Sequence, residues 1–389
     1  MQKALSKTNF FLIFGTVLEY FDYVLFMELS FFISKIFFPG NMMSYFYIFS
    51  VGYGARFVGV LMLSMIKRDL GKIMQYCIFT MAVSTLLISL LPCYHSVGLL
   101  ATVSFIILRF IQSLSYSIEF PTAITIQAKQ EDSHSKIGTV IASSTTGGVL
   151  ANVCALLLLR VFSEAQILSF AWRIPFLVSG LIGLTLCRIR ISNVSEQLDL
   201  STYHLNTSHL FNNVEKIVQN TKILLFPCFL IVSYIYFPTF FRNHGYKNLY
   251  YIFKYKTIVL ALSILFVTLA GKFMDKRQDR PIDLQLLQKL FIVAWSVSLI
   301  LSLMHIFGVI LLMLTTQVSI AFYFQLGLKN LLRNSSLALS TLIYNLSMFL
   351  ASLLTLFLDY SISMLIIPLF LSLLFTLCYA QNGVDETDY

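Results

Sequence analysis

Two carboxylates, Glu19 and Asp22, stand three residues apart inside an apolar stretch that runs from Phe10 to Ile33. About 20 apolar residues are enough to cross the hydrocarbon core of a bilayer as a helix. An ionised carboxylate at that depth costs about 3 kcal/mol on insertion scales. Side chains this costly usually face the protein interior and mark proton relays or solute sites. The spacing therefore predicts a buried acid pair on one helix face, suited to gaining and losing a proton.

Two arginines are expected at the same depth as this acid pair. With a rise of about 1.5 Å per residue, Glu19 and Asp22 lie about 14–18 Å from the inner end of the first predicted span. Arg56 and Arg109 lie about 18 Å from the outer ends of the second and fourth spans. Left unpaired, four such charges would cost on the order of 10 kcal/mol, which rivals the stability of a whole domain. We therefore expect a compensated network, either a proton-cycling site or a neutral cluster that only fixes helix packing.

The candidate site residues belong to this network and its neighbours along the same helices. The candidates for proton coupling are Glu19, Asp22 and Arg109. The candidates for contact with a solute are Arg56, Arg109, Gln112, Glu119 and Tyr23. Glu119 lies about 15 Å nearer the inner interface than Arg109, so a loop-contacting or snorkelling role is the alternative for it.

The composition is that of an integral membrane protein. The chain is 58% hydrophobic and only 12% charged, with a mean hydropathy of +0.81, whereas soluble domains carry about 25% charged residues. The formal charge of +9 comes from cations in short loops between spans, so we expect no nucleic-acid partner. Neither metal-ligand spacings nor catalytic motifs stand out, and we expect no metal, no cofactor and no enzymatic activity.

Hydropathy and polar breaks predict an all-α membrane protein with about twelve transmembrane helices. The break near His305 is weak, which leaves ten or eleven spans open. The longest polar stretch, 191–220, predicts a cytoplasmic linker between two six-helix bundles, 1–190 and 221–389. The expected spans are 9–33, 44–66, 72–92, 97–120, 137–160, 168–188, 221–241, 250–271, 286–303, 305–326, 334–357 and 361–381.

The distribution of cations predicts the orientation. Most of them fall in loops expected inside, and few fall outside, which predicts that both termini are cytoplasmic. For a bacterial protein the membrane would be the inner (plasma) membrane. Lys254 and Lys256 open the eighth span, and we expect them at the outer interface; attraction of an anionic solute is the alternative role. The lipid bilayer is the expected surrounding, and a monomer is the expected state.

Several of these residues form motifs, and the motifs resemble those of the major facilitator superfamily. More narrowly, they resemble its metabolite–proton symporter branch, which includes proline/betaine, dicarboxylate, citrate and shikimate carriers. The match covers roughly residues 10–195, and the order and spacing of the motifs make it specific. The motifs are Gly15-x-x-x-Glu19-Tyr20-Phe21-Asp22, Phe37-Phe38-Pro39, Gly52-x-x-x-Arg56-x-x-Gly59, Arg109-x-x-Gln112 followed by Glu119, and Trp172-Arg173-Ile174-Pro175-Phe176.

The chain departs from this pattern in several places, one of which is Phe57 where the second-helix motif usually has proline. Where the family has fourth-helix glycines, this chain has Ser113, Ser117 and Ile118, which predicts larger backbone contacts. The basic loops after the second and eighth spans are altered: 67–72 lacks the acid at its usual position, while 271–277 keeps Asp275. In the family these loops hold the two halves in one state by charge contacts with neighbouring helices.

The resemblance implies two bundles that rock around a central site. Together with the buried charges, it predicts proton-coupled transport of a small polar metabolite, a carboxylate or a zwitterionic osmolyte. Arg56 and Arg109 would tune the acids and bind a solute carboxylate. The alternative, suggested by the altered loops, is a decayed relative that acts as a membrane sensor or structural partner without flux.

Overall fold

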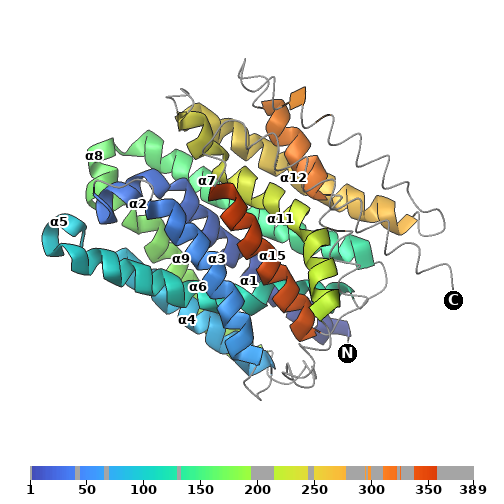
Figure 1. Cartoon of the computed structure of the whole chain (residues 1–389). Helices are drawn as coiled ribbons and strands as arrows, with labels where there is room; N and C mark the ends of the chain where they lie inside the picture. The colour runs from blue at the N-terminus through green and yellow to red at the C-terminus, as the bar shows by residue number, and fades with distance from the viewer. Residues whose placement is uncertain are drawn as a thin grey trace. The chain divides into compact units, whose positions relative to one another are not determined.

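A computed structural model describes residues 2–39, 44–64, 70–128, 133–193, 214–243, 249–276, 294, 297–298, 310–321, 325 and 337–356. Within these residues every regular element is a helix, because a chain in a bilayer must satisfy its own backbone hydrogen bonds. The elements are α1 (Gln2–Glu28), α2 (Ser30–Phe37), α3 (Ser44–Ser64), α4 (Leu70–Leu90), α5 (Tyr94–Val97), α6 (Leu99–Ala128), α7 (Ser133–Val161), α8 (Glu164–Gln166), the π-helical η1 (Ile167–Ala171), α9 (Arg173–Asn193), α11 (Val214–Asn243), α12 (Leu249–Lys276) and α15 (Leu337–Leu356) (Figure 1).

Five of the described helices are long and apolar enough to cross a membrane. They coincide with the third, fourth, fifth, sixth and eighth predicted spans. A sixth is added if Val214–Lys222 and Pro227–Tyr234, two parts of α11 bent by 51°, count as one span. The spans predicted at 286–303 and 361–381 lie largely or wholly outside the described residues. The five helices cover Lys72–Leu90, Leu99–Ile124, His134–Val161, Glu164–Ile189 and Tyr250–Lys276.

The first predicted span ends earlier than expected, and a second helix follows it. The helical hydrogen bonding is barely interrupted at Leu29, since the Leu29 amide still donates to the Leu25 carbonyl at 3.0 Å. The short helix α2 carries Phe37 to an aromatic cluster. Phe37 stacks on Phe105 with ring centroids 4.5 Å apart and meets Trp172 edge to face at 5.5 Å. Two of the family-like motifs, one around Phe37 and one beginning at Trp172, therefore meet in space.

The chain forms two compact units. The first contains Met1–Ala123 and Ser143–Asn206, and the second contains Ile124–Ala142 and Thr207–Tyr389. The segment 124–142, where α6 ends and α7 begins, thus groups with the C-terminal residues. The linker predicted at 191–220 lies mostly outside the described residues, so its role as a domain boundary stays a prediction.

Helices within the first unit pack closely through small residues. The most extensive contact runs between α4 and α9, which lie side by side, and α1 also packs on α9 (Figure 1). A Cβ atom on Gly59 would lie 2.7 Å from the Leu114 carbonyl oxygen, and one on Gly147 would overlap the backbone of Val17. Such positions let membrane helices approach at backbone distance. In the second unit, α11 packs along α15.

The serines that replace family glycines on α6 are accommodated by glycines on α3. A Cβ atom on Gly52 would lie 3.2 Å from Ser113 Oγ, and one on Gly59 would lie 2.9 Å from Ser117 Oγ. The close approach of these two helices is therefore kept, because the space comes from α3.

Candidate proton and substrate site

The four charges predicted near the bilayer centre are all buried in the first compact unit. Glu19 and Asp22 are each 1% exposed, Arg56 is 4% exposed and Arg109 is 5% exposed. The acids come from α1, and the two arginines come from α3 and α6. The structure brings these residues together in two clusters, one around Asp22 and one around Glu19.

The Asp22 cluster connects four helices by hydrogen bonds. Thr85 of α4 donates to Asp22 Oδ2 at 3.0 Å, and Ser179 of α9 donates to Asp22 Oδ1. Gln112 of α6 donates from Nε2 to Thr85 Oγ1 at 2.7 Å, and Arg109 donates from Nη1 to Gln112 Oε1 at 2.6 Å. A chain of hydrogen bonds therefore links the Arg109 guanidinium to the Asp22 carboxylate through two neutral side chains.

The Glu19 cluster has a different character. Arg56 Nη1 lies 3.8 Å from Glu19 Oε1, close enough for an ion pair but too far for a hydrogen bond. Neither carboxylate oxygen of Glu19 has a hydrogen-bond partner in the part of the chain that the structure describes, and the same holds for Arg56 Nε. Buried polar groups are normally hydrogen-bonded, and a buried donor or acceptor without a hydrogen bond costs free energy. This pair therefore has hydrogen-bonding capacity that the described residues leave unused.

Three tyrosine rings surround the Arg56 guanidinium. Its Cζ atom lies 4.5 Å from the ring centroid of Tyr23, 4.8 Å from that of Tyr116 and 5.2 Å from that of Tyr53. The Tyr23 and Tyr53 rings meet edge to face with centroids 5.5 Å apart. A cation–π contact is strongest where water is excluded and uses no N–H donor. The tyrosine cage formed by Tyr23, Tyr53 and Tyr116 thus stabilises the positive charge while leaving N–H donors for an acceptor.

The sequence placed some of these residues and missed others. Glu119, for which an interfacial role was the alternative, is only 4% exposed and acts electrostatically on Glu19. The residues that sequence reasoning missed are hydroxylated side chains in apolar helices, where such residues usually serve packing. The spacing of Tyr53 three residues before Arg56 was the one available signal, because it puts both on one helix face. The missed residues are Tyr53, Thr85, Tyr116 and Ser179.

In the second unit, Asp275 of the second basic loop is hydrogen-bonded to the N-terminus of α7. Asp275, near the end of α12, accepts hydrogen bonds from the backbone amides of His134 at 3.1 Å and Ser135 at 2.8 Å. These amides open α7, where the helix dipole favours a negative charge. A Cβ atom on Gly271 would lie 2.8 Å from the His134 carbonyl oxygen, so the glycine permits the approach. The altered second loop therefore keeps this contact.

The two lysines near the start of α12 differ in exposure. Lys254 is exposed, whereas Lys256 is only 1% exposed, and the interfacial position expected for both stays a prediction. Its Nζ lies 5.5 Å from the ring centroid of Tyr234, whose hydroxyl donates to the Lys256 carbonyl at 3.3 Å. Two residues turn a helix by about 200°, so the second lysine points to the opposite side.

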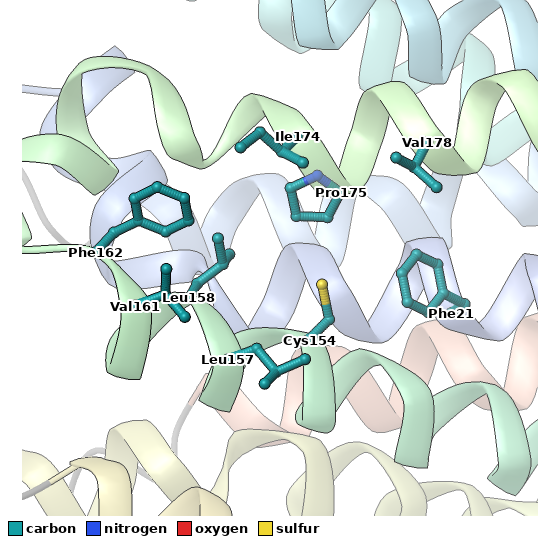
Figure 2. Close-up of a pocket in the computed structure, with 9 residues that line it drawn as sticks. All are labelled: Phe21, Cys154, Leu157, Leu158, Val161, Phe162, Ile174, Pro175 and Val178. Carbon is teal, nitrogen blue, oxygen red and sulfur yellow. The ribbon is translucent and has the colours of Figure 1, made fainter.

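The first unit also has an apolar groove, whose lining includes none of the charged residues of the two clusters. It encloses about 250 Å³ between α1, α7 and α9 (Figure 2). Its lining offers a polar solute no hydrogen-bonding side chain apart from the thiol of Cys154. Figure 2 shows Cys154 and Phe21 among the aliphatic side chains. The full lining is Phe21, Cys154, Leu157, Leu158, Val161, Phe162, Ile174, Pro175 and Val178.

Solved structures identify the fold. The proton:xylose symporter XylE bound to 6-bromo-6-deoxy-D-glucose matches with a TM-score of 0.69 at 13% identity, over 97% of this chain and 94% of that one. A bacterial homologue of the human lysosomal transporter Spinster matches with a TM-score of 0.59 at 14% identity, over 91% and 82%. The chain is therefore an all-α, multi-pass membrane protein with the major facilitator fold.

Sequence comparison finds relatives that are named proline/betaine transporters. The chain is 26% identical over 293 residues to a putative proline/betaine transporter of Staphylococcus aureus (strain MSSA476), covering 69% of this chain and 62% of the relative. It is 29% identical over 199 residues to the proline/betaine transporter of Escherichia coli (strain K12), covering 48% and 39%. The matches thus span about three-fifths or less of these relatives. No protein-family model matches the sequence. The resemblance to the metabolite–proton symporter branch is confirmed by these relatives.

Proposed function

We propose that the protein is a secondary active transporter that couples inward proton movement to uptake of a small polar metabolite by alternating access. The solute is a carboxylate or a zwitterionic osmolyte, as for the relatives named proline/betaine transporters. The protein acts as a monomer in the inner (plasma) membrane of a bacterium, with both termini in the cytoplasm. Proton and solute are its partners.

The Glu19–Arg56 pair carries this proposal. A cluster that only fixed helix packing would be expected to complete the hydrogen bonds of its ion pair. Here a buried acid and a buried guanidinium stand 3.8 Å apart with the Glu19 oxygens and Arg56 Nε unbonded among the described residues. The pair is thus incomplete in the way expected of a site that exchanges ligands.

Competition for Arg56 supplies the coupling. While Glu19 is ionised, its charge serves as the counter-ion of Arg56 in a buried site. A proton that binds Glu19 removes that counter-ion and leaves the guanidinium, still held by the tyrosine cage, able to accept a solute carboxylate in a bidentate contact. Solute and proton therefore bind together, and each leaves more readily once the other has gone.

The formal charges favour a zwitterion over a di- or tricarboxylate. Over the two clusters and Glu119, three carboxylates and two guanidiniums give a formal charge of minus one; Glu28, which is also buried, lies at the far end of α1 and is not counted. One proton makes the set neutral, and a zwitterion keeps it neutral. A solute with several carboxylates would add uncompensated charge in a low-dielectric site, which is costly.

Uptake into proteoliposomes tests the proposal. Purified protein would face an inward proton gradient in the presence of labelled proline, betaine, 2-oxoglutarate, citrate or shikimate at two external pH values. We expect accumulation of a zwitterion that rises as the external pH falls and that a protonophore abolishes. Accumulation that a protonophore leaves unchanged would refute the proton coupling.

A decayed relative without flux is the second candidate, because the first basic loop has lost the position of its acid. The Asp275 contact with the start of α7 argues against complete loss of gating. Solute binding by calorimetry without exchange or uptake in vesicles would favour this candidate.

A further inference from the structure

The hydroxyl of Thr85 is a meeting point for three polar groups. Thr85 Oγ1 lies 3.0 Å from Asp22 Oδ2, 2.9 Å from the Met81 carbonyl oxygen and 2.7 Å from Gln112 Nε2. A hydroxyl has one hydrogen to donate and two lone pairs that accept. The hydrogen can therefore serve only one of the two acceptors, Asp22 or Met81, at any moment.

The chemistry of Arg109 fixes the direction of the neighbouring hydrogen bonds. A guanidinium only donates, so the Gln112 amide must turn its oxygen toward Arg109 Nη1, 2.6 Å away. The amide nitrogen of Gln112 then faces Thr85 and occupies one lone pair of the hydroxyl oxygen. One lone pair and one hydrogen of Thr85 remain for its other two partners.

These remaining valences suit both protonation states of Asp22. When Asp22 is ionised, Thr85 donates its hydrogen to Oδ2. When Asp22 Oδ2 carries a proton, that O–H donates to the free lone pair of Thr85, and the Thr85 hydrogen turns to the Met81 carbonyl. Ser179 donates to Oδ1 in both states. No heavy atom has to move between them.

We propose that Thr85 is a positioning residue that lets Asp22 take up and release a proton in place. The proton comes from the aqueous phase and forms an O–H bond on Oδ2, while the hydroxyl of Thr85 only rotates and keeps its own hydrogen. The inference rests on the proposed proton-coupled function and deepens it, since it adds a second proton site next to Glu19. It also explains why Thr85 and Gln112 are bonded to each other inside the bundle.

The other groups around Asp22 define what a substitution at Thr85 isolates. Arg109 and Tyr116 of α6 act on Asp22 electrostatically. Glu19 lies one turn earlier on α1 and pairs with Arg56 of α3. The helices α4 and α9 face Asp22 with hydroxyls. Removing one hydroxyl therefore changes the hydrogen bonding of Asp22 and leaves the charges around it in place.

Infrared spectroscopy of the reconstituted protein tests the inference without requiring transport. The carboxylic C=O band that acidification produces is assigned to Asp22 by its loss in Asp22→Asn. We expect Thr85→Val, which keeps the shape but lacks the hydroxyl, to shift the pH midpoint of this band by at least about half a pH unit, because hydrogen bonds to charged and neutral groups differ in strength. Thr85→Ser should restore the wild-type midpoint.

Ser89 provides the matched control. It is buried on the same helix, and its hydroxyl donates to the Leu86 carbonyl. Ser89→Ala should leave the Asp22 band unchanged. If Thr85→Val does not yield folded protein, Thr85→Ala takes its place. The inference is overturned if Asp22 gives no protonation band, or if the midpoint is the same without the Thr85 hydroxyl. Absence of solute uptake by wild-type protein with a normal Asp22 band would instead count against the proposed function alone.

Discussion

Replacing Glu19 by glutamine is the sharpest test of the proposed coupling. Glutamine keeps the size of the side chain and imitates the protonated acid permanently. At 3.8 Å and an effective dielectric constant of about 20, the Glu19–Arg56 attraction is about 4 kcal/mol. Without that attraction Arg56 loses its counter-ion, and a solute carboxylate no longer has to displace Glu19. The variant is therefore expected to bind solute without the need for a proton.

The loss of coupling has a measurable size. A proton that moves inward across about 150 mV releases about 3.5 kcal/mol, which supports a solute gradient of a few hundred-fold. In the Glu19→Gln variant we expect this accumulation to fall to equality across the membrane. Exchange of labelled for unlabelled solute should persist and lose the part of its pH dependence that Glu19 contributes. Solute affinity at alkaline pH should rise at least about tenfold, which is about a third of the 4 kcal/mol, because desolvation offsets much of the attraction.

Proteoliposomes and calorimetry measure these quantities. The control is Glu164→Gln, which removes an exposed glutamate from its ion pair with Lys35. Exposed pairs contribute little to stability, so this variant should accumulate solute like the wild type. If Glu19→Gln still builds a proton-driven gradient, Glu19 is not the coupling group and the competition for Arg56 is refuted.

Three further predictions concern the two arginines and the packing of α3 against α6. Arg109→Ala should abolish uphill uptake while the protein still reaches the membrane, as measured by uptake and immunoblotting; retained uptake would exclude Arg109 from the coupling. Arg56→Lys should weaken solute binding by at least tenfold in calorimetry, because an ammonium offers no bidentate fork; unchanged affinity would place the solute elsewhere. Gly59→Ala should destabilise the detergent-solubilised protein by about 1–3 kcal/mol in thermal melts, since its Cβ would lie 2.7 Å from a backbone oxygen. Gly52→Ala, which would meet only the Ser113 side chain at 3.2 Å, should be milder, and equal melting of the two would contradict the packing.

The Asp275 contact gives one more prediction, for the kinetics. Asp275→Asn keeps the size of the side chain but weakens the hydrogen bonds from the start of α7. We expect the rate of uptake, measured by stopped flow, to change. The solute affinity, measured by calorimetry, should stay the same. An unchanged rate would show that this contact is not part of the gating.

Much of the fold followed from the sequence because membrane helices are specified locally. Long apolar stretches must form helices in a bilayer, and their lengths and polar breaks are visible in the chain. The five described membrane-crossing helices accordingly fall on predicted spans. The break after Glu28 was not visible, because the helical hydrogen bonds around Leu29 continue nearly unchanged.

The sequence by itself also identified the charges that are buried together. Glu19, Asp22, Arg56 and Arg109 stood out because ionised groups are rare and expensive at that depth. Only the tertiary structure decided which acid lies next to which arginine. This pairing depends on how the helices α1, α3, α4, α6 and α9 are rotated about their axes relative to one another. Packing gave Asp22 two hydroxyl donors and left Glu19 beside Arg56 with no hydrogen bond among the described residues. Neutral side chains such as Thr85 do not have the high insertion cost that makes charged residues stand out in a sequence. Their roles become visible only from the residues that they contact in the folded protein.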